Sequence, residues 1–479
     1  MPLVSEDVAV ALPERRRVRW HRPALVRAVP PAVLLVLGLI QLGQHRALWY
    51  DEAYSRLAAD VPLPTLLSGM WHRTGVISYL MDVPPSFNGP FYVVLHFWVS
   101  LFGDSALALR LQSLLCAVAA VGVLAELARR LGGPGAGLLC GLLVATSPLV
   151  VAETTQARDY GAALLALTSC GLWLHDVLAS GRHLCRTIAA AVCAALLHWF
   201  TIPVLIGFAL YAWTRRRGSG GRPAAVGLLV ACAPAGLFVA WSLAGGTYGA
   251  PHPPAVGLLL PVRAVTDWSG SSTALAVVLT AAAVVGIWRG QHRTLLLCWF
   301  CVPMVLITSL EVVRATYFSR YLLFTVVALA LAAALGVASI GSAVVRRSAA
   351  ALLVGLSLAA AVPGLDDGDR EPTPQVIAYL AAHQLAGQPI IPADGRVSLD
   401  LETYLPLLPR LSADVVLPPR PFTTQTQSDT VWLVRVVLKQ NSLPVVPAEQ
   451  RLLDADWTVQ QSVQVDGTTT DLRVERWTR

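Results

Sequence analysis

Two adjacent carboxylates, Asp51 and Glu52, follow directly on the first long apolar run of the chain, residues 29–48. Arginines at positions 15, 16, 17, 19 and 22 precede that run. Basic residues favour the cytoplasmic side of a membrane, so the acidic pair is expected at the opposite face. An ionisable group at a membrane boundary needs a partner or a task, and a carboxylate can take a proton from a hydroxyl group. Alternatively, the pair only caps the helix that follows, where negative charge is favourable.

The composition is that of a polytopic membrane protein. The 479 residues are 55% hydrophobic and 14% charged, which is too apolar for a soluble domain. The net charge is +7, but the arginines fall in short clusters between apolar runs, as cytoplasmic loops require. The positive charge therefore does not indicate binding to nucleic acid. The eight cysteines show neither a disulfide framework nor a metal-ligand spacing.

Apolar segments predict about eleven membrane crossings, most of them roughly 17 to 25 residues long. They are 29–48, 106–128, 135–152, 160–178, 187–200, 201–214, 224–243, 271–288, 294–310, 321–343 and 348–364. The further apolar stretch 91–102 decides the topology. As a crossing it would place every later arginine cluster outside, whereas as an interfacial helix it leaves all of them in the cytoplasm. We therefore expect an interfacial helix there and an exterior C-terminal segment.

The expected organisation has three parts. Residues 1–28 form a basic cytoplasmic N-terminus, and residues 29–364 form a mainly α transmembrane domain whose first outer loop is 49–105. Residues 365–479 form a small exterior α/β domain, because charge rises there and apolar runs shorten. Its expected elements are helices at 374–386, 399–408 and 447–455 and strands at 431–438, 457–464 and 470–477. The expected location is the plasma membrane.

The same topology gathers the other conspicuous polar residues on the outer face. They are Asp82, Glu153, Arg158, Asp159, His198 and residues 311–321, beside Asp51 and Glu52. This grouping follows from the arginine pattern alone. The outer face is therefore expected to carry the function.

Several ordered motifs lie between residues 30 and 215. They are Leu48–Tyr54, Asp82–Pro85 leading to 91–98, Leu101–Ser105 with Ala108–Leu111, and Gln156–Tyr160, and Ser319–Leu322 later opens an apolar span. In order and spacing this set resembles the GT-C glycosyltransferases of the protein-mannosyltransferase type (family 39). The resemblance implies a GT-C fold and inverting transfer of a sugar from a polyprenyl-phosphate carrier to an acceptor hydroxyl on the outer face. The sugar would be mannose, arabinose or another pentose, and the acceptor a glycan, a lipid or a protein.

The resemblance also implies roles for single residues. Asp51 would be the catalytic base, and Glu52 would orient the acceptor or raise the pKa of Asp51, since neighbouring carboxylates raise one another's pKa. Arg320 with Tyr321, and Arg158 as a second candidate, would bind the donor phosphate. Alternatively, Arg320 snorkels to lipid headgroups, and Arg158 pairs with Glu153 or Asp159.

Four further residues are candidates for substrate binding: Asp82, Glu153, Asp159 and His198. Each has a structural alternative. Asp159 could serve local charge balance, His198 could be an interfacial histidine beside Trp199, and Asp82 could shape the entry to the interfacial helix. The resemblance implies no metal or other cofactor, although a divalent cation stays an open alternative.

Two competing functions would fit a chain of this size. A transporter or flippase of a lipid-linked sugar would place ionisable residues near the bilayer midplane and often shows paired repeats. Here the charges lie at the ends of apolar runs, and no repeat is visible. A non-catalytic scaffold that binds cell-wall polymer would not need Asp51, Arg158 and Arg320 on one face.

Overall fold

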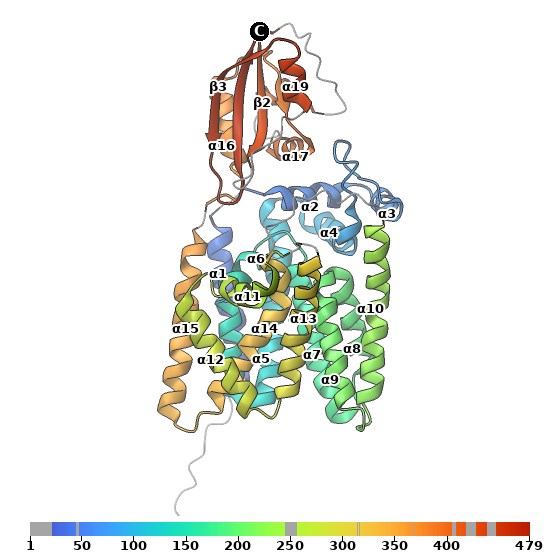
Figure 1. Cartoon of the computed structure of the whole chain (residues 1–479), viewed down its shortest axis with the longest axis vertical. Helices are drawn as coiled ribbons and strands as arrows, with labels where there is room; N and C mark the ends of the chain where they lie inside the picture. The colour runs from blue at the N-terminus through green and yellow to red at the C-terminus, as the bar shows by residue number, and fades with distance from the viewer. Residues whose placement is uncertain are drawn as a thin grey trace, which may run out of the picture.

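The computed structural model describes residues 22–44, 47–244, 256–313, 315, 317–366, 368–404, 409–417, 428–437 and 447–479. Most of the predicted N-terminal part, residues 1–21, lies outside this set. A long helical bundle carries a small sheet domain at one end (Figure 1). The bundle helices are α1 (Arg22–Leu42), α5 (Ala106–Ala145), α7 (Tyr160–Ser180), α8 (Leu184–Leu197), α9 (Ile202–Thr214), α10 (Gly221–Leu243), α12 (Thr273–Arg289), α13 (Arg293–Val313), α14 (Leu323–Ala338) and α15 (Ala343–Leu365).

Seven helices of the described residues are long and apolar enough to cross a membrane, or eight if the bent pair α11 (Leu260–Trp268) and α12 is one span. Helices α8 and α9 are shorter apolar helices. The predicted spans 106–128 and 135–152 both begin within α5, which breaks at Gly133 with φ 84°. Glycine tolerates that conformation, and Pro134 cannot continue the helix hydrogen bonds. The total of about eleven crossings stays a prediction.

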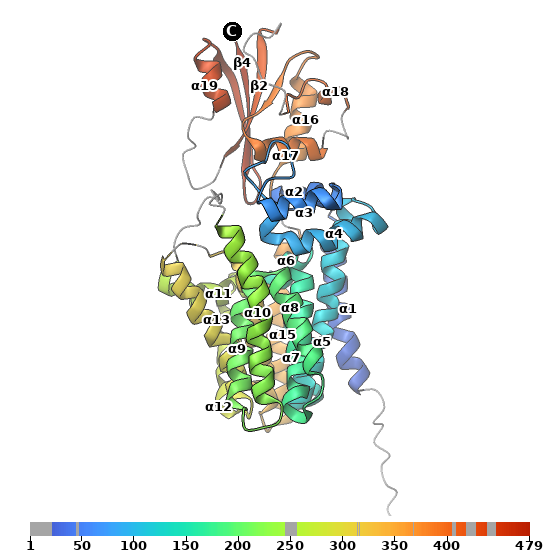
Figure 2. The same cartoon turned by 90° about the vertical axis from the view of Figure 1, so that its right-hand side faces the viewer.

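A layer of shorter helices covers one end of the bundle (Figures 1 and 2). It consists of α2 (Tyr50–Asp60), α3 (Leu63–His72), η1 (Pro85–Asn88) and α4 (Gly89–Phe102). Helix α4 lies across the bundle end and not along its axis, as expected for the stretch 91–102. Buried Tyr54, Phe91 and Leu109 share one apolar core, which attaches this layer to α5.

Beyond this layer, the C-terminal residues form a four-stranded mixed sheet in the order β1-β2-β4-β3. The strands are β1 (Ile390–Pro392), β2 (Thr430–Val437), β3 (Thr458–Val465) and β4 (Asp471–Thr478), and only β1 and β2 pair in parallel. Helices α16 (Thr373–His383) and α17 (Gly395–Tyr404) share one apolar core with this sheet, and α19 (Pro447–Leu453) shares the other. The predicted exterior elements therefore form within a few residues of their expected bounds.

The turns that carry the arginine clusters lie at the other end of the bundle. The α7–α8, α9–α10 and α14–α15 connections are all far from the sheet domain (Figure 1). Asp51 in α2 lies in the layer next to the sheet. The acidic pair and the arginine clusters therefore lie at opposite ends of the bundle, as the predicted topology requires.

Candidate active site

Asp51 lies in the first turn of α2 and faces two guanidinium groups. Its Oδ2 is 3.7 Å from Nη2 of Arg320 and 3.9 Å from Nη2 of Arg158. Arg158 lies between α6 (Pro148–Thr154) and α7, and Arg320 lies in η4 (Ser319–Leu322). Three residues far apart in the sequence thus meet at the layer that covers the bundle.

The four arginines near Asp51 set its charge state. Burial alone would raise the pKa of Asp51. The positive charges of Arg158 and Arg320 outweigh this effect and hold the pKa below its ordinary value. Arg396 and Arg370 add to the same lowering. The expectation of a raised pKa is therefore wrong for this arrangement. Asp51 is a carboxylate at neutral pH, and its oxygens can accept a hydrogen bond from a hydroxyl group.

Glu52 is fully buried and makes an ion pair of its own. Arg110 donates from Nε to Oε1 at 2.8 Å and from Nη2 to Oε2 at 2.7 Å. The backbone N–H of Ala157 donates to Oε1 at 2.8 Å. These contacts join α2 to α5 and to the segment that carries Arg158. They favour a positioning role for Glu52, and the catalytic role implied by the resemblance stays a prediction.

Aromatic rings surround the Arg320 guanidinium. Its carbon lies 4.6 Å from the ring centre of Phe318, 5.3 Å from that of Trp49 and 5.6 Å from that of Tyr321. Nε of Arg320 is buried and has no hydrogen-bond partner among the described residues. A buried donor without a partner is costly unless a ligand completes it. The group is therefore suited to an anionic ligand.

His198 lies near Tyr321 but is held by its own surroundings. Its ring centre is 6.0 Å from that of Tyr321 and 5.2 Å from that of Tyr160. Its Nδ1 accepts a hydrogen bond from the N–H of Phe200 at 3.2 Å. These contacts agree with the interfacial alternative, and direct substrate binding by His198 stays a prediction.

The other three substrate-binding candidates have different environments. Asp159 is buried, and neither carboxylate oxygen has a hydrogen-bond partner among the described residues. Glu153 is also buried and accepts from Nη2 of Arg370 at 3.4 Å and from Nε2 of Gln156 at 2.9 Å. Asp82 is exposed between α3 and η1, outside this set of contacts. Asp159 and Glu153 therefore adjoin the Asp51 site, whereas Asp82 lies apart from it.

The environment of Asp159 predicts a pH-dependent stability. Burial raises the pKa of Asp159 from 3.8 to about 7, although Arg158 opposes this. Between those values the native state holds a proton that the unfolded chain has lost, so stability falls as pH rises through this window. Asp159→Asn does not titrate. Between pH 5 and pH 8 we expect the midpoint of thermal unfolding to fall more in the parent than in Asp159→Asn. An equal fall in both proteins would contradict the assignment.

Residues of the C-terminal part also contact the start of α2, which no pattern in the sequence predicted. The Arg370 guanidinium lies 4.9 Å from the Trp49 ring centre, and that of Arg396 lies 5.0 Å from the Tyr50 ring centre. Glu371 accepts from the N–H of Tyr50 at 2.8 Å and pairs with Arg396. These residues contact Trp49 and Tyr50 at the start of α2 and thereby position Asp51.

Two more contacts reinforce this attachment. The N–H of Ala47 donates to Oδ1 of Asp369 at 2.6 Å, and the N–H of Leu48 donates to the Tyr404 hydroxyl. We call the set Asp369, Arg370, Glu371, Arg396 and Tyr404 the C-terminal clamp. One signal was present in the sequence: Arg110 and Arg370 lie near ends of apolar runs that the predicted topology places outside, where arginine is uncommon. Their partners were not recognisable.

A metal site is not evident in the part of the chain that the structure describes. Within these residues no group of three or more His, Cys, Asp or Glu side chains is arranged to hold a metal ion. The Asp51 site is instead lined by guanidinium groups, which repel cations and attract anions.

Comparison with known proteins identifies the fold. A family model described as dolichyl-phosphate-mannose-protein mannosyltransferase matches residues 88–241. Two crystal structures of ArnT from Cupriavidus metallidurans superpose at 14% identity, covering 93% of this chain and 97% of theirs. The TM-score is 0.54 for the form bound to undecaprenyl phosphate and 0.55 for the apo form. The chain has the GT-C fold. No curated protein sequence matches it.

The GT-C assignment rests on two separate parts of the molecule. The family match spans α4 to α10 and includes Arg110 and Arg158. Asp51, Arg320 and the C-terminal clamp lie outside that match, and the structural similarity extends over them. The GT-C fold that the motifs predicted is thereby confirmed.

Proposed function

We propose that this GT-C protein is an inverting glycosyltransferase that moves a sugar from a polyprenyl-phosphate carrier to an acceptor hydroxyl. The observation that carries the proposal is Asp51, an ionised carboxylate between Arg158 and Arg320 in the layer that covers the bundle. The description of the matching family and the undecaprenyl phosphate bound to ArnT both support this class of donor. Release of polyprenyl phosphate coupled to sugar transfer by the purified protein tests it.

The chemistry follows from the charges around Asp51. Asp51 accepts the acceptor proton while the hydroxyl oxygen bonds to the anomeric carbon of the donor. The bond from that carbon to the phosphate oxygen breaks, and the phosphate leaves with the electron pair. Arg158 and Arg320 stabilise the phosphate as its charge grows, because charge-assisted bonds from guanidinium to phosphate are strong. Attack opposite the leaving group inverts the anomeric centre.

The same arginines couple donor binding to the strength of the base. Without donor, they lower the pKa of Asp51. A bound phosphate would share their positive charge, so the proton affinity of Asp51 would rise when the donor is in place. The carboxylate would therefore become a better base in the complex than in the free protein.

The sugar, acceptor and membrane side belong to this proposal. Mannose is the sugar that the family description suggests, with arabinose or another pentose as alternatives. The acceptor is a glycan, a lipid or a protein, and the site faces the exterior of the plasma membrane because the arginine clusters lie at the opposite end. Comparing the glycans of a deletion strain with those of its parent would identify both sugar and acceptor.

Arg320→Ala should weaken donor binding more than it alters acceptor binding. The substitution removes a charge-assisted contact to phosphate, which contributes about 1.5–3 kcal/mol, so affinity should fall by roughly tenfold to a hundredfold. Equilibrium binding of a polyprenyl-phosphate sugar to the purified variant measures this. Arg263→Ala is a suitable control, since Arg263 is exposed and pairs with Asp267 on α11. If Arg320→Ala bound the donor as tightly as the parent, Arg320 would not bind the donor phosphate, and contact with lipid headgroups would be its remaining role.

Single cysteines should report the sidedness in whole cells. In a cysteine-free background, a cysteine at Thr468 should react with an impermeant maleimide, whereas one at Arg216 should react only after the membrane is permeabilised. Thr468 precedes β4, and Arg216 follows α9. Labelling of position 216 from outside would overturn the exterior placement of Asp51.

A flippase predicts a different result from the same preparation. It would move the lipid-linked sugar between leaflets without breaking the sugar-phosphate bond. Asp51 belongs to α2, which lies across the bundle end (Figure 2), and Arg158 and Arg320 lie within 4 Å of it. Sugar transfer without membrane vesicles, in detergent, would exclude transport as the sole activity.

A further inference from the structure

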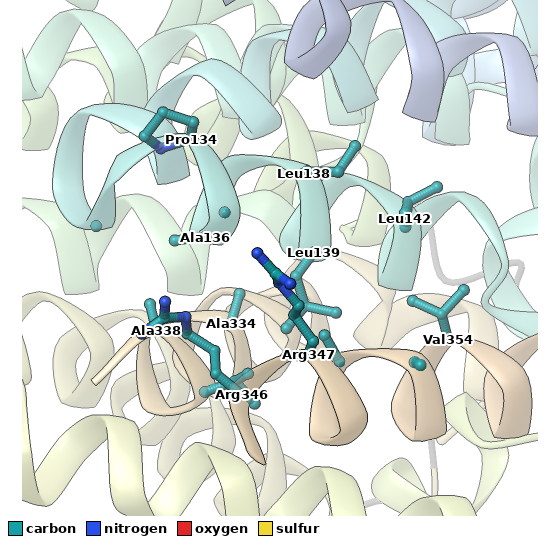
Figure 3. A pocket seen from close by; sticks show the side chains of 15 residues that line it. Pro134, Ala136, Leu138, Leu139, Leu142, Ala334, Ala338, Arg346, Arg347 and Val354 are labelled. Atoms are coloured by element: carbon teal, nitrogen blue, oxygen red, sulfur yellow. The ribbon is translucent and has the colours of Figure 1, made fainter. Parts of the chain in front are cut away.

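A large groove (Figure 3) lies where α14 ends and α15 begins, at the end of the bundle opposite α2 (Figure 1). Its volume is about 600 Å³, and it runs between the second half of α5, the end of α14 and the start of α15. Proline, glycine, alanine, leucine and valine residues line most of it, and Arg346 and Arg347 supply its charge.

The polarity of this groove is graded along its length. Arg346 and Arg347 lie in the first turns of α15, and Val354 lies two turns further on. Figure 3 places Arg346 beside Ala338 near one end and Val354 beside Leu142 at the other. Arg346 therefore lies toward one end of the groove and Arg347 near its middle, beside Leu139, while apolar side chains line the other end (Figure 3).

Helix α15 forms the exposed wall of the groove and α14 the buried wall. Of the most apolar stretch of α15, 17% of the residues are buried, whereas for α14 the share is 89%. Arg346 donates from Nη1 to the carbonyl oxygen of Ile340 at 2.8 Å, which holds its guanidinium at the mouth of the groove. A guanidinium has five N–H donors, so this contact leaves others for a ligand.

We propose that this groove binds one anionic phospholipid from the adjacent leaflet. The phosphate would lie against Arg346 and Arg347, and an acyl chain would fill the apolar part beside Leu142 and Val354. Charge and polarity both match: the arginines favour an anion over a zwitterion, and the apolar walls favour hydrocarbon over water. A free phosphate would leave the apolar part of the groove empty. The polyprenyl-phosphate donor fits less well, since its phosphate would lie at the end opposite Asp51.

Gly135 offers a way to fill the groove without damaging the helix. A Cβ built at Gly135, which lines the groove, meets no atom within 4 Å. Gly355 on α15 is equally open but is not among the lining residues. Gly135→Leu should therefore occupy the space of the acyl chain, and Gly355→Leu is the matched control.

Native mass spectrometry of the purified full-length protein with defined lipids tests the proposal. The parent should bind phosphatidylglycerol more tightly than phosphatidylcholine, and the double variant Arg346→Ala/Arg347→Ala should lose this preference by roughly tenfold or more. Gly135→Leu should weaken binding of both lipids. The double variant Arg215→Ala/Arg216→Ala, at the end of α9 across the bundle from α15 (Figure 1), and Gly355→Leu should behave like the parent.

An unchanged preference in Arg346→Ala/Arg347→Ala, or unchanged binding in Gly135→Leu, would overturn the proposal. Displacement of phosphatidylglycerol by low concentrations of polyprenyl phosphate, dependent on the same arginines, would assign the groove to the carrier instead. If the alanine pair fails to fold, Arg346→Gln/Arg347→Gln takes its place. The readout is lipid binding, so it is independent of whether the protein transfers sugar.

Discussion

Asp51→Asn should lower turnover by about 100-fold or more, the usual scale for loss of a positioned general base. The amide keeps the size of the side chain but cannot accept the hydroxyl proton. Donor affinity should not fall, because Arg158 and Arg320 remain and the opposing negative charge is gone. Turnover of a polyprenyl-phosphate sugar by the purified variant, with donor binding measured separately, distinguishes the two effects.

Asp60→Asn is the matched control for this substitution. Asp60 is an exposed acid at the other end of the same helix α2, and the same change of charge there should leave turnover near the parent value. Transfer at the parent rate by Asp51→Asn would refute the proposed chemistry while leaving the GT-C fold intact.

Glu52→Ala should destabilise the protein by about 3–5 kcal/mol, the cost of removing one partner from a buried ion pair. The Arg110 guanidinium would be left buried without its carboxylate, and the N–H of Ala157 would lose its acceptor. The free energy of unfolding in detergent is the direct measurement. Arg110→Ala should cost a similar amount, and the double variant should cost less than the sum, since the two residues form one interaction.

The pair of Arg56 and Asp104 provides the comparison. Arg56 also lies on α2, but the Asp104 side chain is 46% exposed. A surface pair contributes about 0–1 kcal/mol, so Asp104→Ala should be mild. If Glu52→Ala were equally mild, Glu52 would not be the link that holds α2 to α5.

Local patterns in the sequence were sufficient for most elements of the fold. Apolar stretches and alternating residues predicted α4, β2, β3 and β4 within about two residues, because each is defined by its own hydrophobic period. The arginine pattern placed Asp51, Arg158 and Arg320 on one face, and in the structure both arginines lie within 4 Å of Asp51. The break at Gly133 falls between the expected spans 106–128 and 135–152, but its left-handed backbone conformation was not predicted.

The electrostatics of the site required contacts that no local pattern reveals. The role predicted for Glu52 depended on its neighbour Asp51. In the structure, Glu52 pairs instead with Arg110 from α5. The pKa of Asp51 was predicted in the wrong direction for the same reason, since four arginines from distant segments outweigh the effect of burial. Sequence proximity identified the residues of interest, and only the fold identified their partners.

The C-terminal clamp has a consequence for the order in which the protein matures. Asp369, Glu371 and Tyr404 bind the residues just before Asp51, although more than 300 positions separate the two segments. Synthesis from the N-terminus completes every helix of the bundle before these three residues leave the ribosome. Insertion into the membrane can thus precede completion of the site. A chain truncated after α15 is expected to integrate into the membrane yet remain inactive, so nascent molecules would not act on lipid-linked sugar during their own biogenesis.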